Sequence, residues 1–236
     1  MTVKPAKRAE FREIIYRSDR WILLKQLRNK ATKIMKPLDE SYLENLVHGS
    51  IARGDVSEKS DIDIFITSDQ SSFSVETTLE RARIPIKKRF VVQATPTYAM
   101  KAHIELDENT SVTFPLMKMR KVEREFYRFG GEANRGQLEK GIRVLGVDKR
   151  LMLIEPTEKG HRENTVAGRE EQVAKMLGIS TETVLDRVHA LFRRDEIGRT
   201  GVFIKEELAG EETFEMALKR LAAKNPAVRR RLTSLS

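Results

Sequence analysis

Hydrophobic positions along the first third of the chain change from a helical to a strand-like period. Across residues 7–35 apolar side chains recur every three or four positions, which predicts one helix that ends before Pro37. Between Asp61 and Thr67 isoleucine stands at every second position, and this alternation predicts a strand with one polar face. The two aspartates on that face, Asp61 and Asp63, are the first candidates for chemistry.

The middle of the chain has the pattern of mixed helices and strands. Helices are expected at 74–83 and 118–128, and a β-branched run predicts a strand at 90–94. Two further strands, 101–106 and 111–116, flank a polar stretch with hairpin-turn chemistry. This mixture predicts an α+β fold whose small mixed sheet has flanking helices.

The second half of the chain begins at the helix-breaking pair Gly130-Gly131. A strand is expected within 144–154, followed by a polar, glycine-containing connection over 156–165. A helix that opens at 168–171 is stopped by Gly178, and a second helix follows.

Ser180 or Thr181 is expected to cap that second helix. Gly198 and Gly201 punctuate a short hairpin predicted to end at 202–204. The tail, 214–232, has the pattern of one basic amphipathic helix, which is expected to pack on the protein or to form a dimer.

Charge narrows the choice of partner. The formal net charge is +9, and the basic residues cluster in Lys4–Lys36, in Arg81–Arg89 and in Arg229–Arg231. A positive field attracts polyanions, so nucleic acid is the expected partner, although a solvated basic surface gives the same count.

Other classes of site and location are excluded by composition. The chain has no cysteine, which excludes disulfides, thiolate zinc sites and thiol catalysis. No apolar run reaches the ~20 residues of a membrane span, and the first residues lack the apolar stretch of a signal peptide. A cytoplasmic protein without a membrane partner is the expectation.

The stretch 47–66 combines two patterns that bind phosphate and metal. Gly49-Ser50 forms a turn at a strand end, where backbone N–H groups and a hydroxyl can face an anion, and Gly49 lets the backbone approach it closely. Asp61 and Asp63 stand at i and i+2 of a strand, so both carboxylates project from one face. Repulsion between them favours a bound cation, and Mg²⁺ or Mn²⁺ is the expected cofactor.

The string Gly49-Ser50-Ile51-Ala52-Arg53-Gly54…Ser60-Asp61-Ile62-Asp63 resembles the DNA polymerase β-like nucleotidyltransferase superfamily, especially minimal prokaryotic and archaeal CCA-adding members. The resemblance implies that Ser50 and nearby amides hold the phosphates of a nucleoside triphosphate. It implies that Asp61 and Asp63 are metal ligands. Arg53 suits the triphosphate, but a salt bridge to Asp55 or Glu58 fits it equally well.

Members of that superfamily carry a third carboxylate on a later strand. The second strand of the predicted hairpin, 111–115, has no acid, whereas the first offers Glu105 and the turn offers Asp107. Asp107 has the chemistry of a turn former, so Glu105 is the predicted third catalytic carboxylate. His48, directly before the Gly-Ser turn, either touches the nucleotide or packs as a hydrogen-bonded side chain.

Residues 169–204 resemble a winged helix-turn-helix, which implies nucleic-acid contact from the second helix and the wing. The side chains that this resemblance assigns to the contact are Thr183, Arg187, Arg193, Arg194 and Arg199. A winged helix used for protein contact or dimerisation is the alternative. Expected domains are a basic helix (1–36), a nucleotidyltransferase domain (37–130), a connecting segment with a strand (131–165) and a winged helix with a C-terminal helix (166–236).

The leading hypothesis is a metal-dependent nucleotidyltransferase that moves a nucleoside monophosphate from an NTP to a hydroxyl and releases pyrophosphate. The acceptor is expected to be an RNA or DNA end, with a protein hydroxyl as the rival. The alternative is a nucleotide-sensing, DNA-binding regulator whose transferase site has lost its third acid.

Overall fold

The structure is a computed structural model that describes residues 4–5, 11–68, 70–198 and 201–234. The chain divides into two compact units, each built from separate stretches of sequence. Unit 1 comprises Met1–Lys30, Val47–Ser60 and Arg124–Thr200, and unit 2 comprises Ala31–Leu46, Asp61–Glu123 and Gly201–Ser236. The mixture of helices and sheets confirms the predicted α+β class.

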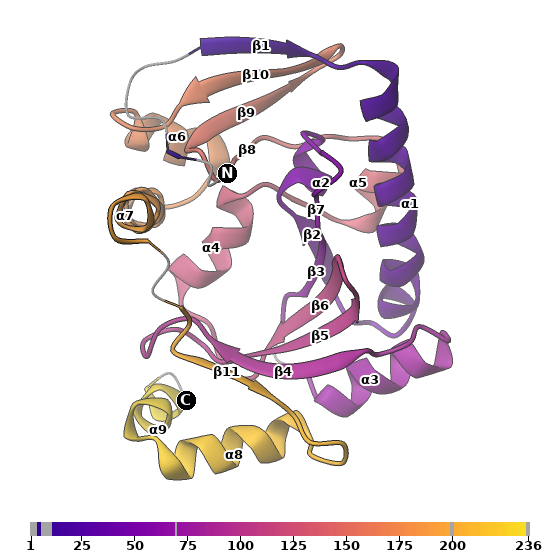
Figure 1. The fold of residues 1–236 in the computed structure, drawn as a ribbon, viewed down its shortest axis with the longest axis vertical. Helices are drawn as coiled ribbons and strands as arrows, with labels where there is room; N and C mark the ends of the chain where they lie inside the picture. The colour runs from indigo at the N-terminus through magenta and orange to yellow at the C-terminus, as the bar shows by residue number, and fades with distance from the viewer. Residues whose placement is uncertain (1–3, 6–10, 69, 199–200, 235–236) are drawn as a thin grey trace. The chain divides into compact units, whose positions relative to one another are not determined.

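Unit 1 contains an antiparallel sheet in the order β1-β10-β9-β8 (Figure 1). Its strands are β1 (Phe11–Ile15), β8 (Gly146–Val147), β9 (Met152–Thr157) and β10 (Gly160–Thr165). Gly160 is required where β10 meets β1, because an added Cβ would lie 1.8 Å from the carbonyl oxygen of Ile14.

The core of unit 1 forms where two helices, α6 (Glu170–Leu177) and α7 (Thr181–Ile197), pack with β8 and β9. Gly178 ends α6 in the left-handed conformation, at φ 63°, and Ser180 caps α7 by accepting a hydrogen bond from the Thr183 amide. The remaining elements of unit 1 are α2 (Ser50–Arg53), most of α4 (Lys121–Phe129), β7 (Glu132–Ala133) and α5 (Arg135–Glu139).

Unit 2 is built on strands in the order β11-β4-β5-β6-β3-β2. They are β2 (Asn45–His48), β3 (Ile62–Ile66), β4 (Lys88–Gln93), β5 (Lys101–Asp107), β6 (Thr110–Pro115) and β11 (Ile204–Glu207). β3 and β6 run parallel, whereas β11 pairs with β4, β4 with β5 and β5 with β6, all antiparallel. The strands predicted over 61–67 and 90–94 and the hairpin predicted over 101–116 are therefore confirmed.

Unit 2 also contains the helices α3 (Ser72–Arg81), α8 (Phe214–Lys224) and α9 (Pro226–Thr233). Phe214 of α8 is fully buried and its ring lies 5.6 Å from that of Phe114 on β6. Ser72 donates two hydrogen bonds to Glu215, from its amide and its hydroxyl, which join the start of α3 to α8. Figure 1 shows α8 running alongside β4 and β11.

The predicted helix over 7–35 is wrong at both ends. Residues 7–10 lie outside the described residues. Phe11–Ile15 form strand β1, because this stretch pairs with β10, whose residues lie 145 to 153 positions away in the sequence. Helix α1 spans Ser18–Glu40 and continues through Pro37. Pro37 cannot donate a backbone hydrogen bond within the helix. The next residue, Leu38, is fully buried, and the free energy of burying its side chain offsets that loss.

Three further expectations are corrected by long-range pairing or local breaks. The polar connection predicted over 156–165 forms the β9–β10 hairpin. The single tail helix is two helices, because Asn225-Pro226 ends α8 and starts α9. Ile204, expected to end a short local hairpin, instead begins β11 and pairs with β4. In the part of the chain that the structure describes, we find no helix with the length and apolar character of a membrane span.

Candidate active site

The Gly-Ser turn lies in unit 1, between β2 and the short helix α2. Gly49 has φ 78° and ψ −144°, a conformation that L-residues rarely adopt. An added Cβ at Gly49 would meet no atom within 4 Å, so the space in front of the turn is open. The Gly49 amide donates to the carbonyl of Gly131 at 2.9 Å, which fixes the turn. An open, fixed turn of this kind suits the approach of a phosphate.

Ser50 is oriented by a second serine. Its hydroxyl donates to Ser60 Oγ at 3.0 Å, and Ser60 Oγ also accepts from the Ser57 amide at 3.0 Å. Ser60 directly precedes Asp61 in the chain. The hydroxyl predicted to bind phosphate is thus hydrogen-bonded to the residue next to the first predicted metal ligand.

Arg53, predicted as a phosphate ligand or as part of a salt bridge, is a buried structural residue. Its guanidinium donates to the carbonyl of Gly130 at 2.5 Å and forms an ion pair with Asp55 at 2.9 Å. Its side chain is only 6% exposed. Of the two alternatives for Arg53, these contacts favour the salt bridge to Asp55 over contact with a triphosphate, because they occupy its charge inside unit 1.

His48 packs among aromatic rings. Its imidazole makes edge contacts with Phe126 and Tyr127, at ring-centroid distances of 6.0 and 4.9 Å. Of the two alternatives for this residue, the packed histidine is the one that these contacts favour.

The two aspartates lie in unit 2, at the start of β3. Asp61 is exposed and precedes the strand, and Asp63 is half-buried within it. The Ser111 hydroxyl donates to Asp63 Oδ1 at 2.8 Å, and β3 and β6 pair Asp63 directly with Ser111. Sequence reasoning missed Ser111, because only the parallel pairing of β3 with β6 brings it beside the aspartate.

Glu105 lies on the same face of the sheet, one strand further along. β5 and β6 pair Glu105 with Ser111, and residues directly opposite in a sheet share a face. Asp63, Ser111 and Glu105 therefore form one transverse line, which we call the carboxylate row. Two strand spacings place the Cα atoms of Asp63 and Glu105 ~10 Å apart. A long glutamate side chain at that spacing can point over Ser111 toward Asp63.

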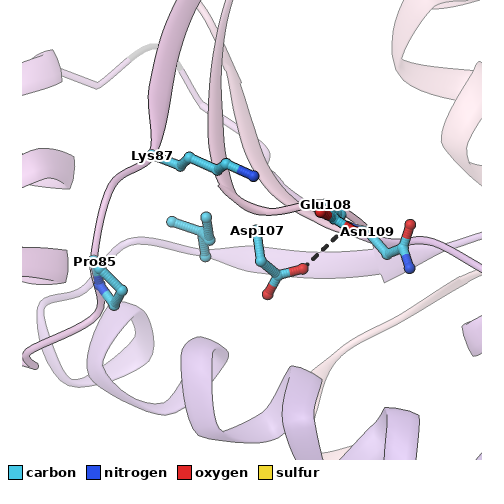
Figure 2. A pocket seen from close by; sticks show the side chains of 6 residues that line it. Pro85, Lys87, Asp107, Glu108 and Asn109 are labelled. Carbon is cyan, nitrogen blue, oxygen red and sulfur yellow. Dashed lines mark hydrogen bonds between the residues drawn. The ribbon is translucent and has the colours of Figure 1, made fainter.

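Asp107 has the turn role that the sequence favoured. Its Oδ1 accepts from the Asn109 amide at 3.0 Å. Figure 2 shows this bond, in which the Asp107 side chain turns back to the β5–β6 turn, beside an open pocket of about 590 Å³. The register shifts between Glu105 and Asp107, and such bulges re-aim neighbouring side chains.

His103 is a neighbour of the carboxylate row that the sequence did not reveal. Its Nδ1 lies 3.0 Å from Thr113 Oγ1, and its Nε2 lies 3.8 Å from Glu105 Oε1. Burial lowers the pKa of His103, and the charges of Asp63 and Glu105 oppose that shift. Its alternation with Glu105 is the sequence signal that could have identified it.

Asp61 and Asp63 have the chemistry of a magnesium site. Carboxylate oxygens are the ligands that Mg²⁺ prefers, and one or two carboxylates with substrate phosphates commonly complete its coordination. Among the described residues, no group of three or more His, Cys, Asp or Glu side chains is gathered closely enough to hold a metal ion.

The side chains of α7 that were assigned to nucleic-acid contact differ in their exposure to solvent. Thr183 is 1% exposed and donates its hydroxyl to Glu125 at 2.6 Å, so it holds the helix start and is removed from the contact set. Arg187 is half-buried, 4.8 Å from the Phe126 ring centroid. Arg193 and Arg194 are exposed, and Arg199 lies outside the described residues.

Comparison with known proteins identifies one part of the chain. Residues 29–128 match the family model of the nucleotidyltransferase domain, and the matched range includes the Gly-Ser turn, both aspartates and Glu105. A solved structure of a CCA-adding enzyme with ATP is similar to the chain at 18% sequence identity and a TM-score of 0.33. That match covers 95% of this chain and 51% of the other, so the chain spans about half its length. No curated protein matches the chain.

Proposed function

We propose that this protein is a metal-dependent nucleotidyltransferase, which moves a nucleoside monophosphate from an NTP to an acceptor hydroxyl and releases pyrophosphate. The carboxylate row carries the proposal, because it sets Asp63 and Glu105 on one sheet face within the matched domain. The fixed, open Gly49-Ser50 turn supports it as a place for the triphosphate.

The chain's own residues have separate tasks in this reaction. Ser50 and the amides of its turn bind phosphate oxygens, and Asp61 and Asp63 bind the cation. Mg²⁺ or Mn²⁺ supplies charge stabilisation for the phosphates and the reacting oxygens. The acceptor oxygen forms a bond to the α-phosphorus as the bond from that phosphorus to the bridging oxygen breaks. The acceptor proton passes to Glu105, and pyrophosphate leaves.

The test is transfer of label from each α-³²P-NTP, with Mg²⁺ or Mn²⁺, to total RNA, DNA fragments or cell protein. Asp61→Asn/Asp63→Asn is expected to abolish transfer. Asp107→Asn, which removes an acid used in a turn, is the matched control and is expected to retain activity. Equal transfer by the wild type and the double variant would refute the proposal.

A nucleic acid is the acceptor that the surface charge favours, and a protein hydroxyl is the rival. We infer that α6 and α7 form the helix-turn-helix part of a DNA- or RNA-binding module, because Gly178 and Ser180 set its turn and cap. Arg193 and Arg194 supply exposed charge on α7.

One observation favours a second candidate, the nucleotide-sensing regulator. The residue paired directly with Asp63 on β6 is Ser111, not an acid. NTP binding by calorimetry that changes duplex affinity, together with no labelled product in any polymer class, would establish the regulator and exclude the transferase.

A further inference from the structure

Two basic segments far apart in sequence, residues 118–121 after β6 and helix α9, meet at one end of the unit 2 sheet. The turn between β4 and β5 and the segment after β6 both lie at the end where β4 finishes, β5 begins and β6 finishes. Helix α9 is joined to the same end by Arg231, whose guanidinium donates to the carbonyls of Thr97 and Lys118 at 3.0 and 2.7 Å.

A buried ion pair holds this junction together. Arg231 Nη2 lies 3.2 Å from Glu123 Oε2, and their side chains are 5% and 1% exposed. The same carboxylate accepts from the Ala99 amide at 2.6 Å and from the Arg120 amide at 2.9 Å. Glu123 is therefore fully engaged in anchoring, and its charge is balanced inside the junction.

The anchoring leaves an excess of positive charge on the surface. Lys118, Lys121, Arg229 and Arg230 are exposed, and Arg120 is half-buried, 4.9 Å from the Tyr98 ring centroid. We call these five cations the basic corner. Within the described part of the chain, Lys118, Arg229 and Arg230 form no ion pair. Because α9 is clamped by its buried face, its outer arginines are held in place at low entropic cost.

We propose that the basic corner binds the phosphodiester backbone of single-stranded nucleic acid. Cations from two segments give a surface that tracks successive phosphates, and a half-exposed aromatic ring beside a guanidinium is the usual companion for unpaired bases. β5 leads from this end of the sheet to Glu105 over four residues, or ~13 Å. A strand bound at the corner thus lies within a few nucleotides of the carboxylate row.

Binding is measured by fluorescence anisotropy of a labelled 12-nucleotide RNA, with DNA of the same sequence and the matching duplex as separate arms. No NTP or divalent metal is present, so the result is independent of transferase activity. Single strands of either sugar are expected to bind more tightly than the duplex, and the RNA and DNA arms identify the preferred backbone.

Arg229→Gln/Arg230→Gln is the principal variant, and Lys118→Gln/Lys121→Gln tests the second segment. If each cation neutralises one phosphate, affinity at 0.1 M salt falls about 5-fold per cation, hence about 25-fold per pair. The slope of log K against log[salt] becomes shallower by about 1.4. Arg81→Gln/Arg83→Gln removes two exposed guanidiniums from the opposite end of β4 and is the matched control. It is expected to change affinity less than 3-fold.

Three outcomes overturn the proposal. One is equal loss of affinity in the control pair, which reports net charge alone. Another is a wild-type dissociation constant for every oligonucleotide weaker than ~100 µM at 0.1 M salt, the weak limit of non-specific binding. The third is a clear preference for the duplex. As a control for folding, the Tm of each variant is measured, and a Tm equal to that of the wild type is expected if Arg231 still holds α9.

Discussion

Replacing Arg53 with methionine tests whether this arginine binds the nucleotide or holds the fold. Methionine keeps much of the side-chain length but removes the charge. The change leaves Asp55, which is 10% exposed, without its partner at 2.9 Å, and removes the donor to the carbonyl of Gly130. Breaking a buried ion pair from one side costs about 3–5 kcal/mol. For a chain of this size, each kcal/mol lowers Tm by about 2–4 °C, so we expect a loss of roughly 6–20 °C.

The assay combines thermal unfolding with NTP titration calorimetry, below the transition of the weakened protein. We expect Arg53→Met to lower Tm with a change in NTP affinity below about 3-fold. Removing both partners, as Arg53→Met/Asp55→Leu, leaves no uncompensated charge and is expected to recover much of the lost stability. The reasoning is refuted if Tm is unchanged while the dissociation constant for NTP rises 10-fold or more.

Three further changes test other parts of the structure. Glu105→Gln should lower kcat about 10²-fold or more with an unchanged Tm, since a positioned base is lost; full activity in the label-transfer assay would contradict its assignment. Burial lowers the pKa of Lys101 from 10.5 to about 8, so the folded protein binds fewer protons than the unfolded chain between these values. Stability should therefore rise from pH 8 to 10.5 in urea unfolding, and Lys101→Met should remove that rise; an identical pH profile in both proteins would show that Lys101 is not the cause. Glu125→Gln should weaken three hydrogen bonds from Ser180 and Thr183, at a cost of about 2 kcal/mol, and speed amide exchange at the start of α7; unchanged exchange there would count against this anchor.

The sequence by itself determined the local geometry of the candidate site. A turn that needs φ 78° selects glycine at position 49, so Gly49-Ser50 is visible from residue type alone. Side chains alternate between the two faces of a strand, so the spacing of Asp61 and Asp63 predicts their common face without knowledge of any partner strand. The helix and strand periods of the middle region were readable for the same reason.

Only tertiary structure decided which distant groups these residues meet. Glu105 and Ser111 join Asp63 through strand register, and register depends on pairings that no local period encodes. Arginine is usually found on the protein surface, yet Arg53 is buried, and its hydrogen bond to Gly130 determines its role.

Residues 11–15 show the same limit, since a short stretch with apolar residues at 11, 14 and 15 fits a helix or a strand until β10 supplies hydrogen bonds to its backbone. The basic corner likewise exists only because the buried Arg231–Glu123 pair brings together segments 108 residues apart. Short-range periodicity fixes which way a side chain points, and long-range packing fixes what lies opposite it.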